Sequence, residues 1–322
     1  MLINLLNKKK YIENIILKWN YPFIYKIIIF LIQIKKNIVS NIKWKFKNYK
    51  NIEWIEKYNI NNNSFCSENR KKWFSAFWRL YNAEDFLEKT VESHINLFDE
   101  IILVNNNSTD NTEKICKKLK KKYPKKIIFY NYPFDIYKIG TLEYKSCKEN
   151  SIHSLSYYYN WTLSKTTYKY VIKLDDDHIV IKEEFKKIIT KIKTNWLNYF
   201  LQTPLLNVFK YKNILSYSYH DIKSSLAWLF GDFGFFKVTE YTYFIKQKNA
   251  ETLIFPYKIK TEKICFLHLK WLKKNMWLKN YWKKVQKKLQ KRINHNNFKG
   301  LSTKYMKILK KYWINYELPP KK

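Results

Sequence analysis

Glycine is scarce in this sequence, with only 4 glycines among 322 residues. The chain consequently contains neither a GxGxxG nor a GxxxxGK[ST] motif, whose glycines let the backbone approach a phosphate group. This absence disfavours dinucleotide sites and P-loop nucleotide sites. Any phosphate group must instead be bound through a metal ion and basic side chains. Because there are also only 7 prolines, flexible linkers are few and we expect few independent domains.

Cysteines and long apolar runs are also scarce. The most apolar stretch, residues 22–34, contains a lysine and falls short of the about 20 apolar residues that span a bilayer. No small-residue cleavage site follows it, which disfavours a signal peptide, so we expect a core helix or an interfacial one. The four cysteines form no CxxC pair and no zinc-ligand spacing, as expected of reduced thiols in a cytosolic protein: Cys66, Cys116, Cys147 and Cys265.

Acidic residues are few: 26 Asp+Glu face 62 Lys+Arg, which gives a formal net charge of +36. Such a surface attracts nucleic acids, anionic membranes and phosphorylated small molecules. The alternative is a solvated basic face that reflects compositional bias and has no partner. A hydrophobic content of 46% and an aromatic content of 19% exclude a disordered polypeptide.

Strand and helix patterns alternate from about residue 72 onward. Leu87, Val91 and Ile95 are spaced as one face of a helix, for which Asn82 and Asp85 offer a capping arrangement. A second helix follows Asp110 with Ile115 and Leu119 inward, and a third is expected over 147–164. Alternating strands and helices predict a parallel sheet covered on both faces. The expected strands are 71–78, 100–104, 125–132 and 168–174.

Polar clusters stand where two of these strands end, "NNNSTD" at 105–110 and "DDDH" at 175–178. Ligands of such sheets bind at the carboxyl ends of the strands. Residues two apart in an extended segment point the same way, so Asp175 and Asp177 would converge on one cation, Mg²⁺ or Mn²⁺. The alternative is that these aspartates cap the helix that begins near "EEFKKII".

Two segments carry a family resemblance: "SAFWRLYNAEDFLEKTVESHINLFDEIILVNNNSTDNTEKI" and "YYYNWTLSKTTYKYVIKLDDDHI". Together they resemble the family 2 glycosyltransferases with the GT-A fold. The resemblance covers about residues 73–190 and returns weakly at 228–271. Its markers are the N-x-E after the first strand, a loop of the "DDGSTD" type and the D-x-D. It implies an α/β, mainly parallel, Rossmann-like sheet flanked by helices. The two ends of the chain fall outside the resemblance, and we expect them to be basic helical extensions.

The resemblance also implies roles for individual positions. Asp175 and Asp177 would hold Mn²⁺ or Mg²⁺ against the donor's diphosphate, with Asp176 between them in the donor site. His268 matches a third metal ligand, and Lys270 would lie beside the phosphates.

On the nucleotide side, the resemblance places Arg79, Asn82 and Glu84 near the donor. Asn105 and Asn106 stand where the family usually has aspartates, the first of which reads the base. An amide both donates and accepts hydrogen bonds, whereas an ionised carboxylate only accepts. Uridine is the default expectation for the base, and the asparagine at position 105 is a departure from the family pattern that bears on this expectation.

The acceptor hydroxyl needs a general base, and the resemblance suggests an inverting reaction with a carboxylate from the second half. Asp232, flanked by glycines in "GDFG", is the first choice, although a simple turn residue is the alternative. Glu251 is the second choice and Glu240 the third. Trp228 and Phe233 could form an acceptor platform or pack in the core.

The expected organisation has three parts. Residues 1–65 form a basic, aromatic helical extension. Residues 70–270 form the catalytic domain, with a nucleotide-sugar half at 70–195 and an acceptor half at 196–270. Residues 271–322 form a basic amphipathic tail that either packs on the domain or lies on anionic lipid. Its apolar stripe is Trp271, Leu278, Trp282, Val285 and Leu289.

The resulting hypothesis is a metal-dependent transfer of a sugar from a nucleotide-sugar donor to a cell-envelope glycan or lipid-linked acceptor. We expect a cytoplasmic protein with peripheral contact to the inner face of the membrane and no nucleic-acid partner. One rival is a nucleic-acid-binding protein, motivated by the charge. The other is a metal-dependent phosphotransferase or nuclease that uses Asp175, Asp177 and His268.

Overall fold

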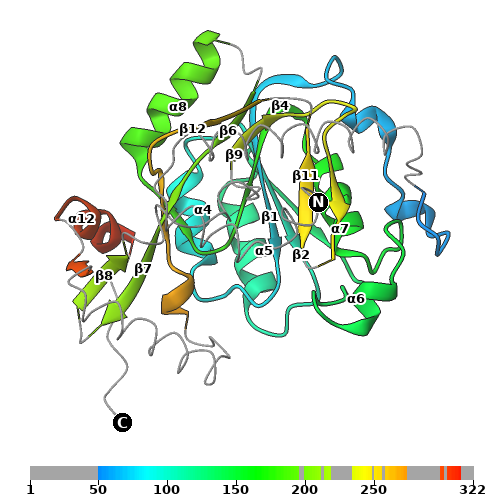
Figure 1. Cartoon of the computed structure of the whole chain (residues 1–322), viewed down its shortest axis with the longest axis horizontal. Coiled ribbons are helices and arrows are strands. Elements are labelled where there is room, and N and C mark those ends of the chain that lie inside the picture. Colours follow the sequence, from blue (N-terminus) through cyan, green and yellow to red (C-terminus); the bar gives the residue numbers. More distant parts are fainter. Residues whose placement is uncertain are drawn as a thin grey trace, which may run out of the picture.

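A computed structural model describes residues 50–195, 199–211, 214–218, 234–248, 250–255, 258–273, 298–300 and 303–312 of the chain (Figure 1). Several sequence predictions lie outside these residues. They concern the apolar segment 22–34, the residues Trp228, Asp232 and Phe233, and the tail stripe from Leu278 to Leu289.

A seven-stranded sheet forms the centre of the molecule, in the order β12-β6-β9-β4-β1-β2-β3. The neighbours β4, β1, β2 and β3 are all parallel, and β9 pairs antiparallel with both β4 and β6. The sheet is therefore mainly parallel, as the sequence predicted. Its strands are β1 (Lys71–Leu80), β2 (Glu100–Asn105), β3 (Ile127–Asn131), β4 (Tyr168–Leu174), β6 (Tyr199–Gln202), β9 (Gly234–Lys237) and β12 (Lys258–Thr261).

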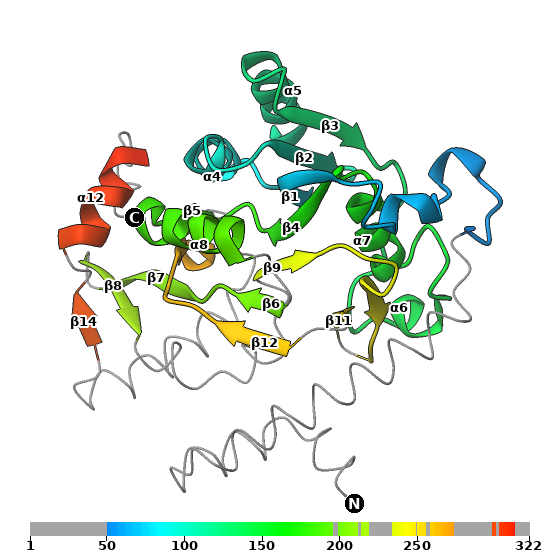
Figure 2. The ribbon, with the colours of Figure 1, turned by 90° about the horizontal axis from the view of Figure 1, so that it is seen from above.

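Alternate residues of the central strands enter two separate cores, one on each face of the sheet. Trp78 and Leu103 face α4 (Leu87–His94), α5 (Thr112–Lys122) and α8 (Lys182–Asn195). Phe77 and Val104 face α7 (Leu155–Ser164) on the other side. Figure 2 shows α4 and α5 on one side of the strands and α7 on the other. The predicted α/β architecture, with helices covering both faces, is confirmed.

A second sheet of five strands adjoins the first, in the order β14-β8-β7-β13-β5. It packs against α12 (Thr303–Tyr312), whose Leu309 is buried with Val208 and Leu267. Its strands are β5 (His178–Val180), β7 (Leu205–Tyr211), β8 (Ile214–Ser218), β13 (Phe266–His268) and β14 (Phe298–Gly300). The remaining elements are the hairpin β10 (Tyr243–Lys246) and β11 (Glu251–Ile254), α6 (Leu142–Ser146), and the 3-10 helices η1 (Glu56–Tyr58), η2 (Asn62–Phe65) and η3 (Lys270–Leu272).

The described parts of the two predicted extensions pack on the domain. Residues 50–65 carry only short 3-10 helices, and Tyr58 and Phe65 are buried beside α7. In the tail, β14 pairs with β8, while Lys304 of α12 lies 3.5 Å from a carboxylate oxygen of Glu184. The described tail therefore includes a strand as well as a helix, and it covers β-sheet surface.

Two helix starts differ from the predictions. The first helix begins at Leu87 with Phe86 as its N-cap, and Asn82 instead accepts a hydrogen bond from the backbone N–H of Thr109 (2.8 Å). The capping role predicted for Asn82 is wrong because this loop contact engages the side chain. The third helix begins at Leu155 rather than 147, since Glu53 accepts the backbone N–H of Ile152 and holds the preceding turns.

All four cysteines are free thiols. Across the described ranges, none of the helices combines the length and apolar character that crossing a membrane requires.

Gly234 is the first residue of β9 and pairs with Gln202 of the antiparallel neighbour β6. A Cβ atom at this position would lie 2.4 Å from the carbonyl oxygen of Leu201 and 2.8 Å from the ring of Phe200. Because backbone cannot move aside cheaply, we predict that Gly234→Ala lowers the free energy of unfolding by about 2–3 kcal/mol. Urea unfolding monitored by circular dichroism measures this, and an unchanged midpoint would show that β6 and β9 can separate without cost.

His94 is fully buried among the aromatic rings of Trp78, Phe98, Phe185 and Phe266. Burial lowers the pKa of His94 to about 3, although its hydrogen bond to the carbonyl of Thr90 opposes the shift. The unfolded chain therefore binds this proton first. The contribution of His94 to the free energy of unfolding is fully present above about pH 6.5 and is lost as the pH falls toward 3.

We predict that, below about pH 6.5, the wild type loses about 1.4 kcal/mol more of its unfolding free energy per pH unit than His94→Gln does. Urea unfolding of both proteins at a series of pH values between 7 and about 4 gives the two slopes. Equal slopes would mean that His94 is not held neutral in the folded protein.

Candidate functional site

The three consecutive aspartates form a turn between two strands. β4 ends at Leu174 and β5 begins at His178. The turn is fixed through its backbone, because Trp78 Nε1 donates to the carbonyl of Asp175 (3.1 Å) and Leu269 N donates to that of Asp177 (2.8 Å). Since β5 separates the turn from α8, which begins at Lys182, the alternative that these aspartates cap this helix is wrong.

The turn geometry changes how the carboxylates are directed. The predicted convergence of Asp175 and Asp177 assumed an extended segment, but residues 175–177 are not a strand. Asp175 lies 3.5 Å from Lys173 Nζ, whereas Asp177 lies 3.4 Å from His268 Nε2. The structure thus directs these two carboxylates to different neighbours.

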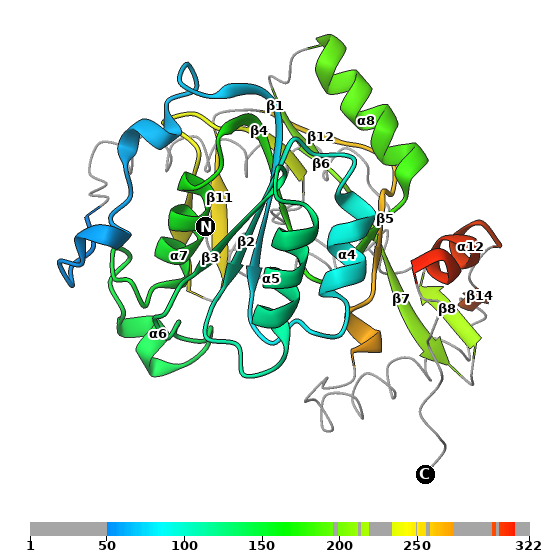
Figure 3. The same cartoon turned by 180° about the vertical axis from the view of Figure 1, so that it is seen from behind.

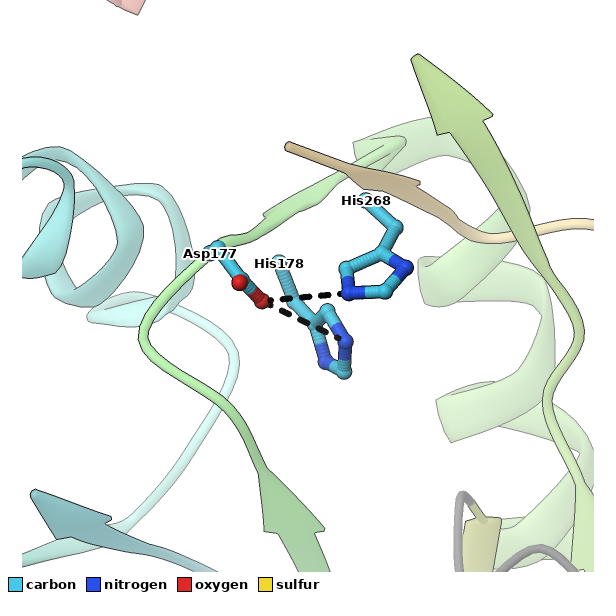
Figure 4. A group of neighbouring side chains, drawn as sticks. All are labelled: Asp177, His178 and His268. Carbon is cyan, nitrogen blue, oxygen red and sulfur yellow. Dashed lines mark ion pairs between the residues drawn. The ribbon is translucent and has the colours of Figure 1, made fainter. Parts of the chain in front are cut away.

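Strand pairing brings His268 to the turn from 90 residues farther along the chain. β13 is antiparallel to β5, and His268 is directly opposite His178 in the register. Asp177, His178 and His268 form a group whose ligand atoms all lie within 4.8 Å of one another. Figure 4 shows the Asp177 carboxylate directed at both imidazole rings. Of the predicted ligands, the structure therefore gathers Asp177 and His268 and adds His178.

One oxygen of Asp177 is left in an unusual environment. Oδ1 is buried without a hydrogen-bond partner among the described residues, 3.4 Å from His268 Nε2. His268 Nδ1 lies 2.6 Å from Asn207 Oδ1, an oxygen that can only accept, so the imidazole proton is on Nδ1. Burial lowers the pKa of His268 to about 4, which keeps the ring neutral at pH 7. Two lone-pair atoms therefore face each other.

A cation between those two atoms would satisfy both. Metal ions bind carboxylate oxygen and imidazole nitrogen at about 2.0–2.2 Å, so two ligands of one ion are about 3–3.5 Å apart. The separation of 3.4 Å between Asp177 Oδ1 and His268 Nε2 fits this. Asn207 holds the far nitrogen of the ring, as outer-shell partners of metal-bound histidines usually do. The residues present therefore fit a divalent ion.

His178 has a different state from His268. The backbone N–H of Asp175 donates to its Nδ1 (3.4 Å), which places the ring proton on Nε2, 3.8 Å from Asp177 Oδ1. Burial is the largest contribution that lowers the pKa of His178. In this tautomer the N–H of His178 Nε2 lies on the side of the ring near the Asp177 carboxylate. The sequence analysis did not assign His178, although it directly follows the aspartates.

Lys273 compensates the aspartates from the other side. Its Nζ lies 2.7 Å from Asp176 Oδ2 and 3.1 Å from Asp177 Oδ2. Burial and the neighbouring Asp177 raise the pKa of Asp176. Burial opposes the charged form of Lys273, but the carboxylates of Asp177 and Asp176 outweigh it and raise the pKa of Lys273. The family resemblance instead predicted Lys270 beside the phosphates. Lys270 is exposed in η3, one turn before Lys273.

The predicted donor-side residues lie at the ends of β1 and β2. The guanidinium carbon of Arg79 lies 3.1 Å from the ring centroid of Tyr159. Burial opposes the ionised form of Asp175, but the pKa of Asp175 is lowered overall by the nearby groups Lys173, His178 and Arg79. Arg79 is therefore close enough to the turn to interact with it electrostatically. Asn82 and Glu84 instead connect the two loops, since Glu84 accepts from the side chain of Asn111 (2.8 Å).

Asn105 and Asn106 differ in which of their side-chain hydrogen-bonding groups are already engaged. Asn106 donates both amide hydrogens, to the carbonyls of Tyr132 (2.9 Å) and Phe134 (2.7 Å). Asn105 donates to Asn131 Oδ1 (3.2 Å), while its own Oδ1 is buried without a hydrogen-bond partner among the described residues. Asn105 therefore retains an acceptor, which is the property that an aspartate would have at this position.

Of the three predicted general bases, Glu251 and Glu240 lie within the described residues. Glu251 accepts a hydrogen bond from the Tyr144 hydroxyl (3.1 Å), and Figures 2 and 3 show its strand β11 away from β5. Glu240 lies between β9 and β10. The assignment of a base to Asp232, Glu251 or Glu240 stays a prediction.

Comparison with known proteins shows which family a part of this chain resembles. Residues 79–134 match the family model "Glycosyl transferase family 2". A stretch of 121 residues is 31% identical to the "Minor teichoic acid biosynthesis protein GgaB" of Bacillus subtilis (strain 168). This stretch is 36% of this chain and 11% of that relative.

Among solved structures, glucosyl-3-phosphoglycerate synthase from Mycobacterium tuberculosis in complex with Mn²⁺, UDP and phosphoglyceric acid aligns over 46% of this chain and 48% of its own, at 14% identity and a TM-score of 0.30. The same enzyme in complex with Mg²⁺ and UDP gives 14% identity over 45% of this chain and 48% of its own, also with a TM-score of 0.30.

The family match and the curated relative agree with the predicted resemblance: the chain contains a segment similar to family 2 glycosyltransferases. The described α/β architecture is the one that the resemblance implied. Residues 79–134 extend from the end of β1 to just beyond β3.

The orphaned oxygen of Asp177 leads to a testable expectation. In Asp177→Asn, the new amide can donate to His268 Nε2 and remove the contact between two acceptors. We predict that the metal-free protein gains about 1–2 kcal/mol of stability. We also predict that Mn²⁺ raises the melting temperature of the wild type but not that of Asp177→Asn.

Thermal unfolding with and without Mn²⁺ measures both effects. Glu92→Gln is the matched control, because it removes a carboxylate that pairs with Lys122 on the surface. An equal Mn²⁺ shift in the wild type and in Asp177→Asn would contradict a metal site at Asp177.

Proposed function

We propose that this protein transfers a sugar from a nucleoside diphosphate donor, UDP-linked, to a cell-envelope glycan or lipid-linked acceptor. The observation that carries the proposal is the buried Asp177 oxygen facing an unprotonated imidazole nitrogen of His268. A divalent ion bound there supplies the Lewis acid that a diphosphate leaving group needs. The mixed oxygen and nitrogen ligands favour Mn²⁺ over Mg²⁺, which prefers oxygen.

The donor would lie along the carboxyl ends of β1, β2 and β4, which are adjacent in the sheet. Arg79 and Lys173 supply positive charge beside Asp175 at this edge. Asn105 offers an acceptor, which suits the N3–H of uracil and does not suit cytosine, whose N3 is itself an acceptor. These features support a uridine nucleotide.

For the acceptor, the comparisons support only a broad chemical class. The curated relative is named as a teichoic acid biosynthesis protein, and we extend from it only the class of acceptor, a polymer of the cell envelope. The net charge of +36 suits an anionic acceptor or membrane surface. We accordingly propose that the protein works at the cytoplasmic face of the membrane.

The reaction itself needs a base that removes the acceptor's proton. We retain Asp232 as the proposed base, because its flanking glycines would let an acceptor hydroxyl approach closely. Inversion at the anomeric carbon follows if that hydroxyl attacks from the face opposite the diphosphate. The residues of the Asp175–Asp177 turn would then act only on the leaving group.

Nucleotide release tests this proposal. The purified protein is incubated with UDP-, GDP- and CMP-sugars in Mn²⁺, in Mg²⁺ and in chelator, and donor binding is measured in parallel by thermal shift. We predict slow release of UDP alone, at least about a hundredfold slower in Asp177→Ala and absent with chelator. Glu92→Gln should match the wild type.

The variant Asn105→Asp tests the base assignment, since it keeps an acceptor and should keep the preference for UDP. A preference of the wild type for CMP-sugars would contradict the role of Asn105. If no donor binds or is cleaved in any metal, the protein is not a nucleotide-sugar transferase.

A further inference from the structure

Lys273 is a cation that contacts the carboxylates of two of the three aspartates. Its ammonium bridges Asp176 Oδ2 (2.7 Å) and Asp177 Oδ2 (3.1 Å), and its side chain is 24% exposed. Adjacent buried carboxylates repel each other unless a cation compensates them. In this structure Lys273 supplies that compensation.

The two oxygens of Asp177 have different partners. Oδ2 pairs with Lys273, whereas Oδ1 faces the imidazole nitrogens of His268 and His178. The lysine therefore does not block the atom that would bind a metal ion. Ammonium and metal would, however, lie on the same carboxylate at close range, where two cations repel each other.

Which cation compensates Asp176 and Asp177 then depends on whether a metal ion and a donor are bound. Without a donor, a divalent ion must enter beside Lys273 and is disfavoured by its charge. Once bound, the ion compensates the aspartates, so the ammonium no longer needs them. A flexible lysine side chain can then turn toward a new anion, and a nucleoside diphosphate presents several negative charges beside the ion.

We propose that Lys273 is a positioning residue that couples metal binding to diphosphate binding: it neutralises Asp176 and Asp177 in the empty site and transfers its contact to the diphosphate when the metal ion and the donor are bound. This inference rests on the proposed function, because it uses the same metal site. Linkage is reciprocal, so the metal and the diphosphate each tighten the binding of the other by the same factor.

The test is Mn²⁺ titration, followed by the electron paramagnetic resonance signal of free Mn²⁺, with and without saturating UDP. The proteins are the wild type, Lys273→Met, Lys273→Gln and the control Lys263→Met, an exposed lysine just before β13. Circular dichroism checks the folding of each. The second substitution, Lys273→Gln, keeps the side chain polar and tests the same loss of charge.

Without UDP, we expect both Lys273 variants to bind Mn²⁺ about tenfold more tightly than the wild type, because the repelling charge is gone. With UDP, we expect the factor by which UDP tightens Mn²⁺ binding to fall by about tenfold. Lys263→Met should match the wild type in both conditions.

The outcomes separate this inference from the proposed function. If the wild type binds Mn²⁺ and UDP but the Lys273 variants bind Mn²⁺ more weakly, or show unchanged coupling, Lys273 does not exchange partners and only this inference fails. If the wild type binds no Mn²⁺ with or without UDP, the metal site is wrong and both fail.

Discussion

A buried carboxylate that must be compensated is the constraint on which the site depends. Asp177 is buried: the Lys273 ammonium lies at one of its oxygens, and the imidazoles of His178 and His268 lie at the other, where a cation would complete the compensation. Removing a charge from water is costly unless partners replace the solvent. The β5–β13 pairing supplies those partners by placing His268 opposite His178. A short piece of the second sheet thus completes a site that begins at the end of the first.

The first sheet determines where that site can be. β1 is central, with β4 on one side and β2 on the other, and all three run parallel. Their carboxyl ends therefore bring Arg79, Asn105 and the Asp175–Asp177 turn to one edge. The loops at this edge are also tied to each other, because the side chain of Asn82 accepts from Thr109 and that of Glu84 from Asn111. Hydrogen bonds between these loops help to fix the positions of the side chains at this edge.

Local sequence patterns predicted the four parallel strands β1, β2, β3 and β4 because their signals are local, but they did not predict β6, β9 and β12 of the same sheet. Runs such as 100–104 are apolar throughout and end in polar residues, so the strands and the site edge follow from the sequence. Lys273 and His178 were missed because their roles depend on pairing between distant segments: β13 meets β5, and η3 follows it. The turn at Asp175–Asp177 was missed because alternation along an extended chain was assumed there. The packing of residues 50–65 on α7 has no periodic signal in the sequence and could not be predicted from it.

The most direct test of the central claim is pulsed electron paramagnetic resonance of Mn²⁺ bound to the protein with ¹⁵N-labelled histidine. The account predicts a hyperfine coupling to one histidine nitrogen in the wild type, and its loss in His268→Asn under conditions in which Mn²⁺ still binds. Bound Mn²⁺ without any histidine coupling would contradict the pairing of Asp177 with His268 as the metal site.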